Sequence, residues 1–142
     1  MDSKFHLALP CMDIQETKAF YLDCIGASLG RETEKWIDIN LFGHQITFTN
    51  AGDFKFDFKE YRLGKHILPS FHFGVIVDND EWGILYKKMF QDKELDITME
   101  VSFMESRIGE HLSFFVKDPN GFTIEFKSFK NDEEIFLSNG KE

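Results

Sequence analysis

A chain of 142 residues is long enough for one compact domain, or for two half-domains with a shared core, but not for two independent domains. Its 42% apolar and 29% charged residues exclude a disordered or fibrous protein. The net charge of −9, the scattered lysines and arginines, and the lack of a long apolar run lead us to expect a cytoplasmic protein that binds neither nucleic acid nor membrane.

The first half of the chain is expected to form a β-α-β-β-β unit. After Pro10, Asp13 is a candidate N-cap, and Glu16 follows three residues later as in a capping box. Apolar residues then continue at helical spacing until Gly26, which is typical of a helix end. The four strands, the second of them weak, are expected at 4–9, 27–31, 36–41 and 45–49.

The second half repeats this order. Its helix is expected to start with Asn79 at the cap position and to bury an apolar face. Its strands are expected at 70–77, 100–104, 111–117 and 122–128. Shifting the sequence by 66 residues places His6 on His72, and a shift of 78 places Thr47 on Glu125. The halves therefore look like copies of one unit.

These patterns predict a single α+β domain over residues 1–142, made of two βαβββ modules in tandem. The modules, the segment between them and the C-terminal tail are expected at 4–50, 70–129, 51–69 and 130–142. The segment between the modules alternates Phe54, Phe56 and Phe58 with charged residues. We interpret it as a linker, although a short edge strand or a flap would have the same composition.

Strand alternation separates a polar from an apolar face in the last strand of each half. Glu125 lies opposite the face that carries Ile124 and Phe126, and Gln45 and Thr47 lie on the corresponding polar face of the first half. If the modules pack about a pseudo-twofold axis, the equivalent strands bring four side chains toward one point. These are His6, His72, Thr47 and Glu125.

His6, His72 and Glu125 are accordingly the candidate ligands of one divalent metal ion. Two imidazoles and one carboxylate leave positions for water, dioxygen or a chelating substrate, as in non-haem Fe(II) oxygenases. A structural zinc site would be closed by four protein ligands. Taken singly, a strand histidine is more often structural, and Glu125 could face solvent. The equivalent places of the histidines in the two halves favour the metal site.

Further candidates are expected around these ligands. His111 is a candidate acid-base group, although a surface or core histidine would fit the same pattern. Gln45 could orient a substrate oxygen or a metal-bound water, and Thr47 is a non-ligating substrate-binding residue. Arg107 is one of four basic residues that could bind an anionic substrate. The other three are Arg31, Arg62 and Lys65.

Three segments carry a resemblance to a known family. Phe5-His6-Leu7, Phe71-His72-Phe73-Gly74 and the stretch 118–127 resemble the vicinal oxygen chelate superfamily, and the resemblance extends over about residues 5–129. This superfamily includes glyoxalase I, extradiol dioxygenases, and bleomycin and fosfomycin resistance proteins. The resemblance implies paired βαβββ modules that form a cup-shaped, mostly antiparallel mixed sheet, usually in a homodimer.

The resemblance also implies a small-molecule substrate and a metal-dependent reaction. We expect an extradiol-like dioxygenase that uses Fe(II), while Mn(II), Zn(II) or Ni(II) would suit the same ligands. Glyoxalase I typically has a fourth ligand where this chain has Thr47, so a glyoxalase-type isomerase or lyase is a weaker candidate. A fosfomycin-type thiol transferase is a further candidate activity. A metal-free binding protein of the bleomycin-resistance kind is the alternative from another functional class.

Overall fold

The computed structural model describes residues 1–139, without the side chain of Met99, and the chain divides into two compact units. Unit 1 comprises Met1–Asp57 and Asp118–Phe122, and unit 2 comprises Phe58–Lys117 and the chain from Thr123 onward. Each unit contains one βαβββ module. The expected α+β fold of two such modules is therefore confirmed.

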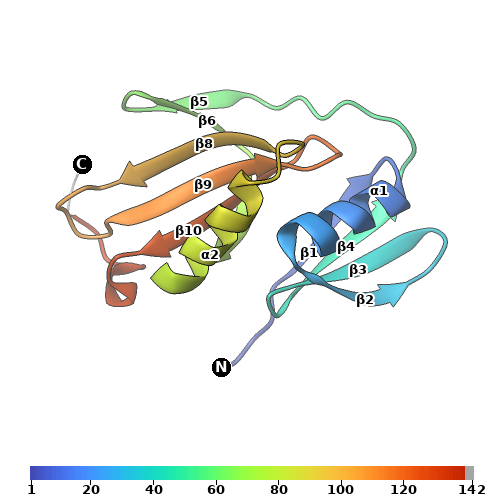
Figure 1. Cartoon of the computed structure of the whole chain (residues 1–142), viewed down its shortest axis with the longest axis horizontal. Helices are drawn as coiled ribbons and strands as arrows, with labels where there is room; N and C mark the ends of the chain where they lie inside the picture. Colours follow the sequence, from blue (N-terminus) through green and yellow to red (C-terminus); the bar gives the residue numbers. More distant parts are fainter. Residues whose placement is uncertain (140–142) are drawn as a thin grey trace. The chain divides into compact units, whose positions relative to one another are not determined.

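Unit 1 is a four-stranded sheet with a helical layer on one face. Its elements are β1 (His6–Cys11), α1 (Ile14–Ala19), a π-helical segment (Phe20–Ile25), β2 (Ser28–Glu32), β3 (Trp36–Leu41) and β4 (His44–Asn50). The strand order is β1-β4-β3-β2, and only β1 and β4 are parallel. The helical layer covers one face of this sheet (Figure 1), where the Tyr21 and Phe48 rings lie 4.9 Å apart.

The helix of unit 1 begins and ends as the sequence predicts. The Asp13 carboxylate accepts a hydrogen bond of 2.8 Å from the backbone N–H of Glu16, which satisfies a donor that the first helical turn leaves open. At the other end, Gly26 has φ of 88°, a left-handed conformation that glycine adopts without steric penalty. The capping residues thus confine the helical layer to the length that covers the sheet.

Unit 2 repeats this topology after a two-stranded hairpin. Its elements are β5 (Glu60–Leu63), β6 (His66–Pro69), β7 (Phe73–Ile76), α2 (Asn79–Phe90), β8 (Asp96–Phe103), β9 (His111–Lys117), β10 (Thr123–Phe129) and a short 3-10 turn (Asp132–Glu134). The strand order is β7-β10-β9-β8, and β7 is parallel to β10. Figure 1 shows α2 lying across this sheet.

The second helix starts from Asp78 rather than from Asn79. The Asp78 carboxylate accepts a 2.8 Å hydrogen bond from the N–H of Glu81, and Asn79 is the first helical residue. In both units the cap comes two residues after the strand ends, so Asp78 is the counterpart of Asp13. The offset between the copies is therefore 65 residues at this point. Within residues 1–139, no helix is long and apolar enough to cross a membrane.

Two strands of unit 2 differ in length from the prediction. The first, expected at 70–77, covers Phe73–Ile76 only, so His72 immediately precedes the strand. The strand expected at 100–104 is β8, and it begins at Asp96 because Asp96 and Ile97 pair with the C-terminal end of β9. Partner strands therefore decide lengths that local composition does not.

Residues 60–69 of the segment that we interpret as a linker form the β5–β6 hairpin. Gly64 occupies its turn with φ of 59°. Leu68 is 3% exposed and packs with Phe103 and Phe115, and the His66 ring lies 5.5 Å from that of Phe103. These contacts are on the sheet face opposite α2, since α2 packs its Trp82 on Phe114. The hairpin thus covers part of the free face of the unit 2 sheet.

Candidate functional site

The two parallel strand pairs have the same register. Ala8 pairs with Thr47 in unit 1, and Gly74 pairs with Glu125 in unit 2. Thr47 and Glu125 therefore occupy equivalent places, as the shift of 78 residues predicts. His6 precedes Ala8 by two residues, and His72 precedes Gly74 by two residues.

Unit 2 brings His72 and Glu125 together. The Glu125 side chain lies on the face opposite α2, the residue is 8% exposed, and its Oε1 is 3.5 Å from Nε2 of His72. Nδ1 of His72 is 2.9 Å from the carbonyl oxygen of Pro69, which can only accept a hydrogen bond. Nδ1 therefore carries a proton, and the neutral ring directs the lone pair of Nε2 toward Glu125. A hydrogen bond of this kind orients metal-binding histidines.

The two side chains stabilise each other's charged form. Interaction with Glu125 raises the pKa of His72 above its ordinary value. Burial acts to raise the pKa of Glu125, but contacts with His72 and the charge of Lys127 outweigh it and the pKa is lowered. A proton added to Nε2 of His72 would make the two side chains an ion pair. A divalent ion can replace that proton, so the donor set fits a metal.

Lys127 and Ser113 are the polar neighbours of this pair. Nζ of Lys127 is 3.5 Å from Oε1 of Glu125. Ser113 pairs with Lys127 across β9 and β10 and is fully buried. Its hydroxyl is near enough to lower the pKa of Glu125, but it makes no regular hydrogen bond within the described part of the chain. Such an unpaired buried hydroxyl is uncommon and calls for a partner.

His111 shares this face, as strand alternation predicts. Its ring lies between Phe103 and Phe129, with centroid distances of 5.1 and 4.9 Å. Nδ1 is 2.8 Å from the carbonyl oxygen of Gly109, so that nitrogen donates and Nε2 is the acceptor of the neutral ring. Burial lowers the pKa of His111. The lowered pKa favours the neutral form that a general base requires.

The polar face of unit 1 is organised around Asp38. Thr47 donates its hydroxyl to Asp38 Oδ1 at 2.7 Å, and the Gln45 amide donates to Oδ2 at 3.2 Å. Arg31 Nε donates to the same Oδ2 at 2.6 Å. Asp38 is 3% exposed. Three of the candidates that the sequence singles out, Thr47, Gln45 and Arg31, therefore direct their polar groups to one buried carboxylate.

Asp38 is not predicted by the sequence analysis as the centre of this polar network. It stands between Ile37 and Ile39, which are fully buried on the opposite face. The alternation that distinguishes Glu125 from its neighbours would also have found Asp38.

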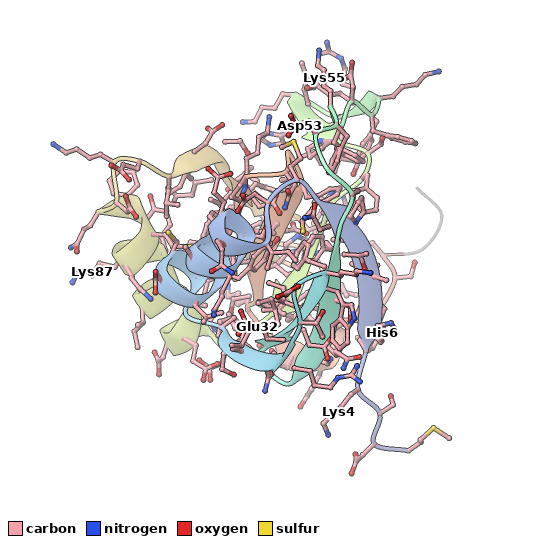
Figure 2. The ribbon with its side chains drawn as sticks, turned by 90° about the vertical axis from the view of Figure 1, so that its right-hand side faces the viewer. Lys4, His6, Glu32, Asp53, Lys55 and Lys87 are labelled. Atoms are coloured by element: carbon pink, nitrogen blue, oxygen red, sulfur yellow. The ribbon has the colours of Figure 1, made fainter. Side chains whose placement is uncertain are left out.

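A cavity of about 330 Å³ adjoins this network in unit 1. Its polar lining consists of Lys4, Arg31, Asp38, Asn40, His44 and Gln45. His6 is exposed at the start of β1, near Lys4 (Figure 2), and its charge helps to lower the pKa of Asp38. His6, Gln45 and Thr47 are thus placed together in unit 1.

The last predicted site residue, Arg107, lies in the loop between β8 and β9, where its N–H bonds to the carbonyl of Met104. Arg107 is therefore not on the strand face that carries Glu125. Among residues 1–139, no three His, Cys, Asp or Glu side chains are grouped closely enough to hold a metal ion. Unit 2 supplies two of the three expected ligands, and the third, His6, is part of unit 1.

Comparisons with known proteins agree on one family. The model of the Glyoxalase/Bleomycin resistance protein/Dioxygenase superfamily matches residues 5–126. A glyoxalase/bleomycin resistance protein/dioxygenase from Alicyclobacillus acidocaldarius is similar in structure, with a TM-score of 0.77, 26% identity, and coverage of 96% of this chain and 97% of that one. No curated protein matches the sequence.

Two further solved structures share the fold at lower identity. The genomically encoded fosfomycin resistance protein of Listeria monocytogenes has a TM-score of 0.69 and 15% identity, over 96% of this chain and 99% of that one. Lactoylglutathione lyase from Agrobacterium tumefaciens has a TM-score of 0.64 and 15% identity, over 90% and 94%.

Proposed function

The chain belongs to the Glyoxalase/Bleomycin resistance protein/Dioxygenase superfamily, and we propose that it is a metal-dependent enzyme that binds a small molecule through two adjacent oxygens. The observation that carries this proposal is the His72–Glu125 pair, with a Nε2 to Oε1 distance of 3.5 Å and the His72 tautomer set by Pro69. His6, at the equivalent place in unit 1, is the third ligand of the proposal.

Members of this superfamily usually bind a divalent metal ion. An ion held by His6, His72 and Glu125 would polarise the substrate oxygens and stabilise the charge that develops on them. Thr47 stands where the symmetric fourth ligand would be, and its hydroxyl is committed to Asp38. The three protein ligands of the proposal therefore leave coordination positions that the substrate oxygens could occupy. We propose Fe(II) as the bound ion, and Mn(II), Zn(II) and Ni(II) would suit the same three ligands.

The proposed reaction is extradiol-type ring cleavage of an aromatic diol. Both atoms of dioxygen enter the product, the ring carbon–carbon bond beside the diol breaks, and the substrate supplies all the electrons. His111 has the role of base in this proposal, because its Nε2 is the acceptor that remains after Nδ1 has bonded to Gly109. Gln45 and Thr47 would contact the substrate from the Asp38 network, and Arg107 would meet an anionic substrate at the loop.

Metal analysis tests the site. Protein expressed without a His-tag is expected to contain about one divalent ion per chain, because the three ligands form one site. His72→Ala and Glu125→Gln should each remove it. His44→Ala is the matched control, since His44 bonds to the N–H of Phe5 and not to the pair. Full metal content in a His6→Ala, Glu125→Ala double variant would refute the site.

Substrate assays under anaerobic Fe(II), followed by admission of air, distinguish the reactions. A dioxygenase consumes one dioxygen per catechol and forms a ring-cleaved product. Turnover of the methylglyoxal–thiol adduct would indicate an isomerase or lyase instead, and thiol-dependent loss of fosfomycin would indicate a transferase. Tight binding of an aromatic compound by metal-free protein would indicate a binding module.

We also propose a homodimer. Each four-stranded sheet has two edge strands, β1 and β2 in unit 1 and β7 and β8 in unit 2, and open edges are usually covered. Light scattering of the purified protein should give twice the mass of 16.6 kDa.

A further inference from the structure

On the face of the unit 2 sheet opposite α2, Lys127 places a positive charge beside the proposed metal site. Its Nζ is 3.5 Å from Oε1 of Glu125, and its neighbours on this face are Glu125, Ser113, Phe129 and Ile76. Among these neighbours, Glu125 is the one acid. A divalent ion bound to Glu125 would more than cancel the charge of that carboxylate. Lys127 would then be a cation without its present counter-ion, next to another cation.

Ser113 provides an independent observation at the same place. Its hydroxyl is buried without a regular hydrogen bond among the described residues, and it is the cross-strand partner of Lys127. An ammonium and a hydroxyl donor side by side are the groups that bind a carboxylate or another oxyanion. The rings of Phe115 and Phe129 border the two donors, with Phe129 5.8 Å from Lys127 Nζ. These aromatic neighbours suit an aromatic ligand that carries a carboxylate or another oxyanion.

We propose that Lys127 and Ser113 form a subsite for an oxyanion of the substrate, so that the substrate is an aromatic diol that also carries a carboxylate. This inference rests on the proposed function for the diol and adds the anionic group. The acceptor Nε2 of His111, two residues before Ser113, faces the same side and receives a hydrogen bond from a substrate hydroxyl. The net positive charge of the loaded site selects the dianion formed by the carboxylate and one ionised phenol.

Two probes that differ by one carboxylate test the subsite. Isothermal titration of the Zn(II)-loaded protein with catechol and with 3,4-dihydroxybenzoate, without oxygen chemistry, gives their affinities. Lys127→Met is expected to weaken 3,4-dihydroxybenzoate about tenfold, the effect of one charged hydrogen bond, and to change the affinity for catechol much less. Lys127→Arg should restore the affinity. Lys87→Met is the control, because Lys87 is exposed on α2 (Figure 2), which covers the other face of the sheet.

Equal losses for both probes, or no loss for either, would overturn the subsite. Failure of the proposed function has a different signature, because the wild-type protein would then bind no zinc. In that case, NMR titration of the metal-free protein decides. Shifts of the His111, Ser113 and Lys127 amides with 3,4-dihydroxybenzoate and not with catechol would support the oxyanion subsite, and the absence of such shifts would refute it.

Discussion

At the scale of single residues, two buried carboxylates have opposite surroundings. Asp38 receives hydrogen bonds from Thr47, Gln45 and Arg31, so its oxygens are fully engaged. Among the described residues, the polar side chains beside Glu125 are those of His72, Lys127 and Ser113. The first arrangement stabilises a fold, and the second leaves an anion ready for a ligand. Asp38 is therefore a structural acid, and Glu125 is the acid of the proposed site.

The surroundings of Asp38 predict a pH-dependent stability. Burial acts to raise the pKa of Asp38, but the Thr47 hydroxyl and Arg31 outweigh it, so the folded-state pKa is lowered. The ionised form then stabilises the fold above about pH 4, and this contribution is lost as the pH falls through the folded-state pKa. Asp38→Asn should lower the free energy of unfolding at pH 7 by about 1–2 kcal/mol.

Urea unfolding of both proteins from pH 7 down to pH 3 measures this effect. The difference between wild type and Asp38→Asn should shrink as the pH decreases. Asp53→Asn is the control, because Asp53 is an exposed acid of the same unit (Figure 2). A difference that is constant with pH would show that the charge of Asp38 does not stabilise the fold.

At the scale of elements, the β7–β10 pair depends on Gly74. A Cβ at this position would overlap the carbonyl oxygen of Glu125 and come within 2.6 Å of its carbonyl carbon. Both atoms are backbone and cannot move aside without separating the strands. The equivalent residue in unit 1 is Ala8, which pairs with Thr47. The close approach is thus particular to the strand pair that positions His72 and Glu125.

Gly74→Ala is expected to destabilise the protein by about 3 kcal/mol, since overpacking against backbone forces strand movement. Its metal content should also decrease, because Glu125 and His72 would separate. Gly83→Ala provides a control of opposite sign: a Cβ there meets no atom within 4 Å, and alanine favours the helix by about 1 kcal/mol. Thermal unfolding and metal analysis measure both effects, and a Gly74→Ala protein with wild-type stability would contradict the close approach.

The elements themselves were predictable to different degrees. Strong local signals, such as the Asp13–Glu16 cap and Gly26, locate the first helix correctly. The second cap was misplaced by one residue, because the repeat offset is not constant along the chain. The β5–β6 hairpin was interpreted as linker because its composition is charged. Its order comes from Leu68, which packs on residues distant in sequence.

At the scale of the whole molecule, the turn 118–122 belongs to unit 1 although the strands on either side of it belong to unit 2. Asn120 is 2% exposed and accepts a 2.8 Å hydrogen bond from the N–H of Met12. Its amide donates to Thr17 at 3.1 Å. Tyr21 donates to Asp118 at 2.9 Å. In a segment whose sequence indicates only a turn, Asp118, Asn120 and Phe122 are therefore buried in unit 1.

Asn120→Ala should lower the free energy of unfolding by about 2–3 kcal/mol, because the N–H of Met12 and the Thr17 hydroxyl would lose a buried partner. Hydrogen exchange should show faster exchange of the Met12 amide than in wild type. In Asn131→Ala, which removes an exposed amide near Glu134, stability should stay within about 0.5 kcal/mol. Equal exchange at Met12 in wild type and Asn120→Ala would refute this role.

The sequence alone determined the order of the elements within the two modules, the duplication, and the faces that carry Glu125 and His111. Those features follow from periodicity and spacing, which short stretches of chain contain in full. Only the tertiary structure decided that Pro69 sets the His72 tautomer, that Asp38 engages Gln45 and Thr47, and that the turn 118–122 joins unit 1. Most of these contacts join separate elements, and packing places them, because no local pattern specifies which distant group a polar side chain will meet.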